Sequence, residues 1–334
     1  MTIKVAIFGA SGFVGAELLR LCAMHPAFVP ARLFGDSQAG QKLEAVHPQL
    51  ALAWPGLEVE RYAPSALDGI DLAFAALPHG HSQGIAREIL GRGIPFVDLG
   101  ADFRLDSAED YARWYREPHQ APDLLDAFVY GIPELHREAI RRARAVAAAG
   151  CYPTTAILAL KPLLDLIDPT TIVVDAASGV TGAGRGLKEE THFSTVDENF
   201  TAYGLLTHRH TAEMEMALDG SVLFTPHLLP ANRGILATCY AKANGPCEPL
   251  AALRAAYADE PFVHVSERSP ATKWTLGSNA VHVTARYDER TGRVLAIAAL
   301  DNLVKGAAGQ MIQCANLMLG LDEEAGLPKV GVCP

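Results

Sequence analysis

The sequence contains no hydrophobic run long enough to cross a membrane. Its continuous apolar stretches, such as residues 72–77 and 156–160, have the length of a strand, whereas a membrane-spanning helix needs roughly 18 apolar residues or more. The chain passes from Met1 directly into a strand-like segment, with no stretch that resembles a cleavable signal peptide. We therefore expect a cytoplasmic protein without a membrane partner.

Cysteine is scarce and is not arranged in pairs. The six cysteines show no CxxC spacing, which argues against both a zinc site and a disulfide framework. His79 and His81 lack the helical i, i+4 spacing with a glutamate that metal-dependent hydrolases use, so we expect no metal. In a reducing compartment most of these cysteines would be small core residues, which leaves a chemical role open for one of them.

Basic residues are fewer than acidic residues in this sequence. Lys and Arg total 28 against 38 Asp and Glu, for a net charge of −10, and this balance argues against a nucleic-acid partner. An anionic ligand must therefore be held by a few placed cations and backbone amides. The remaining composition, 49% hydrophobic and 20% charged, is typical of globular proteins, and the length allows two domains with separate cores.

Strand-like and helical segments alternate in the first half of the chain. We expect strands at 3–8, 28–34, 72–77 and 96–99, with helices at 13–22 and 82–90. Such alternation predicts a parallel, doubly wound sheet with right-handed crossovers. Ligands of such sheets bind at the carboxyl ends of the strands.

The pattern changes after Gly150. A helix is expected at 155–164, and the alternating segments 171–174, 221–228, 236–243, 280–287 and 294–300 indicate a largely antiparallel sheet. The sequence therefore predicts an α/β protein with a Rossmann-like domain, residues 1–150, completed by a C-terminal helical segment, residues 302–334. Residues 151–301 would form a second, α+β domain that carries the catalytic and substrate-binding residues.

A glycine loop, residues 9–15, links the first strand to the first helix in GxxGxxG spacing. Glycines there permit a tight turn and close approach of the backbone to a pyrophosphate, and the helix N-terminus favours an anion. A simple tight turn is the alternative, but the position at the start of a βαβ pattern favours a dinucleotide. The residues expected to hold it are Gly9, Ser11, Gly12, Phe13, Val14 and Gly15.

The end of the second strand leaves the dinucleotide type open. An acidic residue at this point usually binds the ribose hydroxyls of NAD, and an arginine accepts the 2′-phosphate of NADP. Asp36 is close to this position but follows Gly35, in a loop that can turn its side chain away. From these residues alone, NAD and NADP are both possible.

Cys151 is the cysteine that we single out for chemistry. It lies between Gly150 and the start of a helix, with Pro153 in the first turn. Proline is tolerated there because an N–H in the first turn would have no partner within the helix. The positive end of the helix dipole lowers the pKa of a thiol in this position and raises its thiolate fraction, which is how a cysteine nucleophile is activated. The alternative is a buried structural cysteine.

With these motifs in place, the chain resembles the N-acetyl-gamma-glutamyl-phosphate reductase family, which is related to aspartate-semialdehyde dehydrogenase. Two features depart from the family: Ala148-Ala149 stand where Asn-Pro is common, and the loop of Ser37 lacks an arginine that many members carry. The resemblance covers nearly the whole chain and rests on the segments 9–15, 76–80, 98–105, 130–134, 150–154, 178–185, 208–210, 224–227 and 302–310.

The resemblance implies an NADP-dependent reductase, with NADP preferred to NAD, whose cysteine attacks an acyl phosphate. The thioester on Cys151 would be reduced to an aldehyde, with phosphate released. We favour His210 as the catalytic base and keep His208 as a substrate or structural contact; in a strand the two would share one face. Arg209 could be solvated or could pair with Glu213 or Glu215.

Further site residues follow from the resemblance and from their chemistry. Cations and a hydroxyl suit the carboxylate and phosphate of the substrate; the candidates are Arg104, Arg185, Lys188 and Tyr203, although Arg104 could instead pair with Asp102. Additional cofactor contacts are expected at Ser37, Leu77, Pro78, Gly182 and Asn302. A homo-oligomer, a dimer or a tetramer, is the expected assembly.

Three alternatives remain beside the glutamyl enzyme. The aminoadipate-phosphate reductase of lysine biosynthesis and aspartate-semialdehyde dehydrogenase share its chemistry. A dinucleotide-binding redox sensor without turnover would need the glycine loop but no base beside the cysteine.

Overall fold

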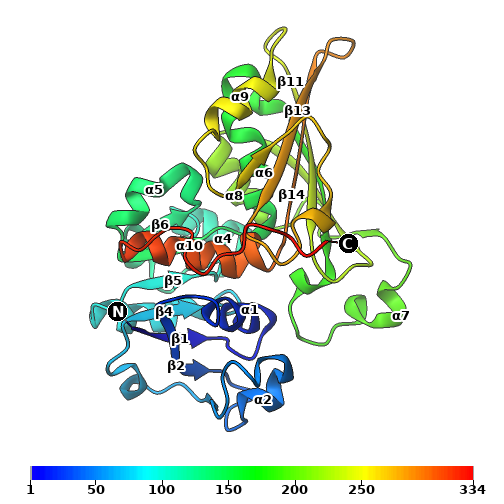
Figure 1. The fold of residues 1–334 in the computed structure, drawn as a ribbon. Helices are drawn as coiled ribbons and strands as arrows, with labels where there is room; N and C mark the ends of the chain where they lie inside the picture. The colour runs from blue at the N-terminus through cyan, green and yellow to red at the C-terminus, as the bar shows by residue number, and fades with distance from the viewer. Residues whose placement is uncertain (1, 334) are drawn as a thin grey trace. The chain divides into compact units, whose positions relative to one another are not determined.

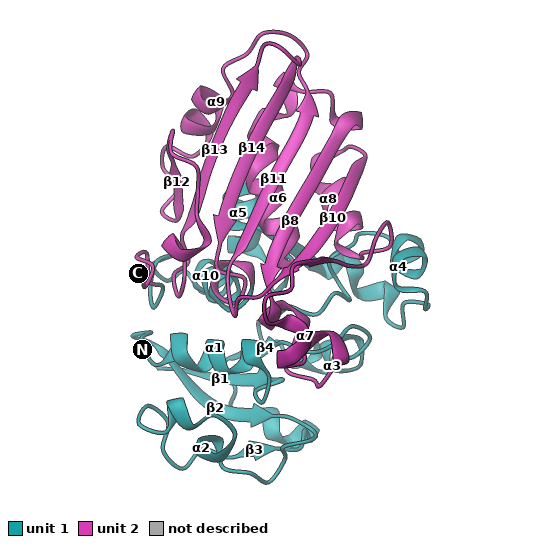
Figure 2. Cartoon of the chain, turned by 90° about the vertical axis from the view of Figure 1, so that its right-hand side faces the viewer, with its two compact units in different colours: residues 1–149, 307–327 teal, residues 150–306, 328–334 magenta. Residues whose placement is uncertain are grey.

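The computed structural model describes residues 2–333 and divides into two compact units (Figures 1 and 2). The first comprises residues 1–149 and 307–327, and the second comprises residues 150–306 and 328–334. Among the described residues, no helix combines the length and the apolar character required to traverse a bilayer.

The first unit is built on a seven-stranded sheet with all neighbouring strands parallel, in the order β3-β2-β1-β4-β5-β7-β6. The strand β1 lies between β2 and β4, so the connections reverse direction there, as in dinucleotide-binding sheets. The strands are β1 (Ile3–Phe8), β2 (Phe28–Phe34), β3 (Val59–Glu60), β4 (Leu72–Ala75), β5 (Phe96–Asp98), β6 (Phe128–Gly131) and β7 (Ala145–Ala148).

Helices cover the faces of this sheet, which explains its continuous apolar strands. Every residue of β4 and β7 is buried, and Lys4 is the one exposed residue of β1, as expected for a parallel sheet between two helical layers. The C-terminal helix α10 packs with α1 and α5 in this unit. The helices are α1 (Phe13–Cys22), α2 (Leu43–Val46), α3 (Ser82–Gly91), α4 (Ala108–Tyr115), α5 (Pro133–Arg142) and α10 (Gly309–Met318).

The second unit also contains a seven-stranded sheet, but a mixed one, in the order β12-β13-β14-β11-β8-β10-β9. The pairs β8/β10 and β12/β13 are parallel, and the others are antiparallel. The predicted fold class is therefore confirmed. The strands are β8 (Ile172–Gly179), β9 (Thr201–Ala202), β10 (Val222–Leu229), β11 (Ile235–Lys242), β12 (Val263–Val265), β13 (Val281–Asp288) and β14 (Arg293–Leu300).

The helices α6 (Cys151–Leu160), α8 (His210–Leu218) and α9 (Pro249–Ala256) lie on one face of the second sheet (Figures 1 and 2). Figure 2 shows the opposite face, where no described helix of the second unit covers the central strands β14, β11 and β8. Burial alternates along β10 and β11 accordingly. The short helix α7 (Phe193–Val196) belongs to the loop region between β8 and α8.

The helix α6 is apolar on all sides, and nine of its ten residues are buried. It begins at Cys151, four residues before the expected start, because Gly150 is extended and acts as the N-cap. It continues from Lys161 as a 3₁₀ helix. Pro162 has no N–H to donate to the α-helical ladder, which accounts for this change.

Candidate active site

Cys151 is the first residue of α6 and is partly exposed. The thiols of Cys22 and Cys239 are different, because full burial raises the pKa of Cys22 to about 12 and raises that of Cys239 as well. Both therefore stay protonated near neutral pH. Of these three cysteines, only Cys151 combines access to solvent with a helix N-terminus.

Gly306 packs directly against the nucleophile candidate. A Cβ atom at position 306 would lie 2.7 Å from the Cβ of Cys151 and 3.3 Å from its Cα. Any larger residue would push α6 or the turn after β14 out of place. The glycine at this position is therefore explained by close packing against Cys151.

A buried carboxylate connects the two segments that carry the candidate nucleophile and base. Glu213, in α8, is fully buried, and its Oε2 accepts a hydrogen bond of 2.9 Å from the backbone N–H of Gly150. Its Oε1 lies 3.8 Å from Nε2 of His210, the first residue of the same helix. Glu213 thus contacts the N-cap of the helix that begins at Cys151 and the imidazole that we favour as base.

His208 lies in an aromatic surrounding and differs from His210. Its ring meets those of Tyr152, Tyr203 and Phe224 edge-on, with centroids 5.3–5.7 Å apart. Burial, with smaller effects of neighbouring positive groups, lowers the pKa of His208 to about 3. Its Nδ1 accepts a hydrogen bond of 3.2 Å from the backbone N–H of His210, so the imidazole is neutral with its proton on Nε2.

The two tyrosines beside His208 form a hydroxyl chain. Tyr203 donates to the hydroxyl of Tyr152 at 3.3 Å, and Tyr152 donates to the carbonyl of His227 at 2.9 Å. Burial raises the pKa of Tyr203 to about 12 and raises that of Tyr152 further. Both side chains therefore remain neutral phenols, able to donate but not to carry negative charge near neutral pH.

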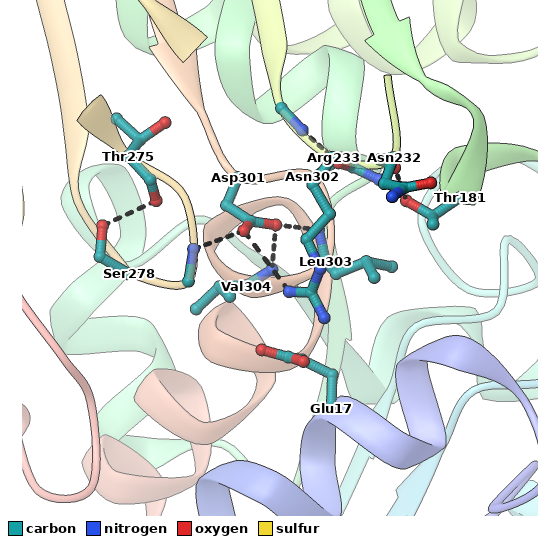
Figure 3. A network of polar contacts seen from close by, with 12 residues as sticks. Glu17, Thr181, Asn232, Arg233, Thr275, Ser278, Asp301, Asn302, Leu303 and Val304 are labelled. Carbon is teal, nitrogen blue, oxygen red and sulfur yellow. Dashed lines mark hydrogen bonds and ion pairs between the residues drawn. The ribbon is translucent and has the colours of Figure 1, made fainter. Parts of the chain in front are cut away.

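Asn302 and Gly182 are brought together in the second unit. Asn302 donates to the hydroxyl of Thr181 at 2.9 Å and accepts from the backbone N–H of Gly234 at 2.8 Å. The Thr181 hydroxyl in turn donates to the carbonyl of Asn232 (Figure 3). Asn302 therefore holds the loop that contains Gly182, which is a structural role the sequence pattern does not reveal.

The turn at Asn302 is itself fixed by the preceding buried carboxylate of Asp301. Its two oxygens accept hydrogen bonds from the backbone N–H groups of Gly277, Leu303 and Val304 (Figure 3). The guanidinium of Arg233 lies 3.5 Å from the same carboxylate. This arrangement gives a rigid support to the end of β14.

The glycine loop in the first unit has the form expected of a dinucleotide cradle. Gly9 has a φ of +79°, and a Cβ there would collide with the carbonyl oxygen of Ala76; a Cβ at Gly15 would collide with the carbonyl oxygen of Gly9. Gly12 is the N-cap of α1. The residues Ser37, Leu77 and Pro78 follow β2 and β4, the neighbours of β1, and so lie at the same carboxyl edge.

The expected substrate residues are divided between the two units. Arg104, in the first unit, is buried, and its Nη2 donates to the carbonyl of Leu99 at 2.6 Å. Asp102 instead accepts from the backbone N–H groups of Gly80, Ser82 and Gln83, at the start of α3.

Arg185, Lys188 and Tyr203 belong to the second unit. The two cations are exposed in the loop after Gly184, whereas Tyr203 is partly buried beside His208. This placement leaves the two cations accessible to an anion in solvent.

The sequence patterns missed Glu213 and the role of Gly306. The sequence did not decide whether His208 and His210 lie in a strand; His210 begins α8, so Glu213 follows it at helical i, i+3 spacing. The His-x-x-Glu spacing of residues 210–213 was the sequence feature that could have identified Glu213 as a partner of His210. Among residues 2–333, no group of three or more His, Cys, Asp or Glu side chains is arranged to hold a metal ion.

Two family models match separate parts of the chain. A model described as "Semialdehyde dehydrogenase, NAD binding domain" matches residues 4–143, and "Semialdehyde dehydrogenase, dimerisation domain" matches residues 151–302. The N-acetyl-gamma-glutamyl-phosphate reductases of Pelotomaculum thermopropionicum and of Jannaschia sp. are 47% and 46% identical to this chain, and each alignment covers 100% of both sequences.

Solved structures share the fold at much lower identity. Aspartate semialdehyde dehydrogenase II from Vibrio cholerae superposes with a TM-score of 0.72 at 18% identity, over 96% of this chain and 99% of the other. The Candida albicans enzyme with NADP gives a TM-score of 0.66 at 15% identity, over 96% and 99%. At these identities the likeness concerns the fold.

Proposed function

Since the chain belongs to the N-acetyl-gamma-glutamyl-phosphate reductase family, we propose that it reduces N-acetyl-L-glutamyl 5-phosphate to N-acetyl-L-glutamate 5-semialdehyde and phosphate, a step of arginine biosynthesis. The observation that best supports this activity is the carboxylate of Glu213. It contacts both the amide of Gly150, at the N-cap of the Cys151 helix, and the imidazole of His210. The reaction calls for this combination of nucleophile, base and orienting acid.

In the proposed mechanism, Cys151 attacks the acyl carbon of the substrate. His210 accepts the thiol proton, and Glu213, at 3.8 Å, stabilises the imidazolium that forms. The carbon–oxygen bond to phosphate breaks, and the acyl group is held on sulfur as a thioester. After reduction, collapse of the tetrahedral adduct on Cys151 releases the aldehyde and restores the thiolate.

We assign His208 a supporting role. With a pKa near 3 it does not take up a proton near neutral pH, and its Nδ1 is engaged by the backbone N–H of His210. It therefore orients His210 and presents Nε2–H as a donor. This difference between the two imidazoles favours His210 as the base.

The residues of the glycine loop fit a nicotinamide dinucleotide, because Gly9 and Gly15 permit a tight strand-to-helix turn in which a Cβ would collide with neighbouring backbone. We propose that Gly9, Ser11, Gly12, Phe13, Val14 and Gly15 hold its phosphates, with Ser37, Leu77, Pro78, Gly182 and Asn302 as further contacts or supports. When bound, the reduced nicotinamide supplies the hydride that the thioester accepts. We propose NADP rather than NAD and a cytoplasmic location.

For the substrate we propose that the exposed cations Arg185 and Lys188 bind its anionic groups, with Tyr203 as a hydroxyl donor. Both cations lie exposed in the loop after Gly184, and their charges match those of a phosphate. Arg104 remains a candidate for the carboxylate, although one of its N–H groups is used by the carbonyl of Leu99.

We also propose that the chain forms a homo-oligomer, a dimer or a tetramer, through the uncovered face of the second sheet. That face carries Leu223, 51% exposed, and the partly exposed Leu229, Leu236, Leu295 and Ile297, a set of apolar groups that a second copy would bury. Light scattering should find an oligomer for the parent chain and a shift towards monomer for Leu223→Lys. A monomeric parent would refute the assembly.

The activity is tested by running the reaction in reverse with purified protein. N-acetyl-glutamate semialdehyde, phosphate and NADP⁺ should give NADPH with a higher kcat/KM than the same assay with the aspartyl or aminoadipyl semialdehyde, and a higher kcat/KM than with NAD⁺. A preference for another semialdehyde would overturn the proposed substrate. A preference for NAD⁺ would overturn only the cofactor assignment.

A further inference from the structure

The second unit contains a cavity of about 350 Å³ at the β12 edge of its sheet. Its lining is apolar apart from three basic side chains, His264, His282 and Lys329. None of the lining residues belongs to the cluster around Cys151, and the proposed reaction uses none of them.

The two histidines of this cavity are directly opposite each other on neighbouring strands. The parallel strands β12 and β13 pair His264 with His282 in register, so both side chains project from the same face. That face is opposite to Val281 and Val283, which are buried. The imidazole centroids are 4.9 Å apart, with the ring planes inclined by 57°.

This spacing matches that of two imidazoles on one metal ion. With each ligating nitrogen about 2.1 Å from the ion, two adjacent ligands place their ring centroids about 5 Å apart. We propose that His264 and His282 form a two-imidazole site for a divalent transition-metal ion such as zinc, nickel or copper, with water completing the coordination. Imidazole is a preferred ligand of these ions.

A metal ion at this position would connect the edge strand β12 to the rest of the sheet. The strand β12 has three residues and, among the described strands, pairs with β13 alone, and an ion held by one side chain from each strand would link the two. With two protein ligands the site would be weak and exchangeable, so the stabilisation of the folded chain would increase with the logarithm of the ion concentration once that concentration exceeds Kd.

Lys329 distinguishes a metal site from an anion site. Its ammonium lies 5.9 Å from the centroid of the Phe262 ring, inside the same cavity, where it would repel a cation and attract an anion such as phosphate. The in-register imidazole pair favours a metal ion, whereas Lys329 favours an anion, and replacing Lys329 separates the two possibilities.

The test is a calorimetric titration of nickel chloride into the full chain carrying Cys151→Ser, which removes one competing thiolate. In that background, His264→Gln and His282→Gln should each weaken nickel binding at the proposed site by about tenfold or more, and Lys329→Met should strengthen it. His192→Gln is the matched control, because its exposed imidazole contacts Ser194 rather than a second imidazole; it should leave the affinity unchanged.

A second measurement uses the unsubstituted chain, so that it does not depend on the folding of a variant. Nickel should protect His264 and His282, but not His192, from acylation by diethyl pyrocarbonate, as read by peptide mass spectrometry. Equal acylation with and without nickel would overturn the proposal. So would unchanged nickel affinity in both histidine variants, or phosphate binding that is lost in Lys329→Met while nickel binding does not depend on the two histidines.

Discussion

The two units each contain a seven-stranded sheet, but the two sheets differ in strand direction and in burial. The strands of the first sheet are parallel and covered on both faces, so β4 and β7 present no side chain to solvent. In the second, burial alternates along β10 and β11. The first unit can therefore contact a ligand mainly through backbone groups at the ends of its strands, in a loop where Gly9 and Gly15 leave no room for a side chain. The second unit instead supplies reactive side chains, such as the thiol of Cys151.

This comparison predicts that the two proposed tasks can be separated by mutation. Cys151→Ser, in the second unit, should lower kcat by about 10⁴-fold or more, because the reaction loses its nucleophile. The affinity for NADPH, measured by fluorescence titration, should be nearly unchanged, because the glycine loop belongs to the first unit.

Cys247→Ser is the matched control for the nucleophile. Cys247 is also partly exposed, but burial and Glu248 raise its pKa, so its loss should leave kcat unaltered. Near-normal turnover in Cys151→Ser would refute the covalent mechanism. Loss of NADPH binding in the same variant would refute the separation of tasks.

A smaller effect is expected for Glu213→Gln. The amide oxygen of glutamine can still accept the hydrogen bond from Gly150, whereas the charge beside His210 is lost. We expect kcat to fall by about 10²-fold, while the free energy of unfolding, from urea titration, changes little. Glu215→Gln, whose carboxylate accepts from the backbone of Val222, is the control and should retain kcat. Equal losses in the two variants would contradict a specific role for Glu213.

In the first unit, the equivalent test concerns a glycine rather than a reactive group. Gly9→Ala should cost about 1–2 kcal/mol for the left-handed backbone and a further 1–3 kcal/mol for the collision with Ala76. Gly40→Ala shares the positive φ but has open space around the Cβ, so it should show only the backbone cost. Urea unfolding measures the loss of stability in each variant, and NADPH titration measures the loss of affinity. Equal losses in the two variants would contradict the claim that Gly9 is required for close packing against Ala76.

Much of the fold could be predicted because apolar runs and alternation are local signals. The strands β1 and β2 match their expected bounds, and β10, β11, β13 and β14 agree to within a residue. The strand β7 was missed because Ala145, Ala147 and Ala148 have little β-propensity; it is a strand because β5 and β6 pair with it on both sides. The parallel pairing of β8 with β10 could not be read from alternation, which is the same in both orientations.

The candidate site was predictable in part. Gly150 and Cys151 were identified because a glycine before a helix start is a local pattern. Glu213 was not, because its hydrogen-bond partner lies 63 positions earlier in the chain. A contact of this kind depends on how α8 packs against α6, and tertiary packing of that kind leaves no regular spacing in the sequence.

The smallest predicted effect is a pH response of opposite sign in the two units. Burial raises the pKa of Asp98, in the first unit, to about 7, above its unfolded value of about 4. The folded carboxyl keeps a proton that the unfolded chain releases, so its contribution to stability is complete below pH ~4 and is lost as the pH rises through 7. His208, in the second unit, has a folded pKa of about 3, below its unfolded value of about 6.5. Its contribution is complete above pH ~6.5 and is lost as the pH falls.

Acidification from pH 7 to pH 5 should therefore stabilise the region of β5 and destabilise the region of α8, each by at most about 1.4 kcal/mol per pH unit. Hydrogen exchange with mass spectrometry, corrected for the intrinsic rate at each pH, resolves the two regions in one sample. Asp98→Asn keeps an oxygen that can accept from Ser82 and Gly100 but does not titrate, so it should flatten the response of the first unit alone. His208→Gln should flatten that of the second unit alone. A response of the same sign in both regions would mean that at least one of the two buried groups does not govern the pH dependence of its unit, since the two pKa shifts act in opposite directions.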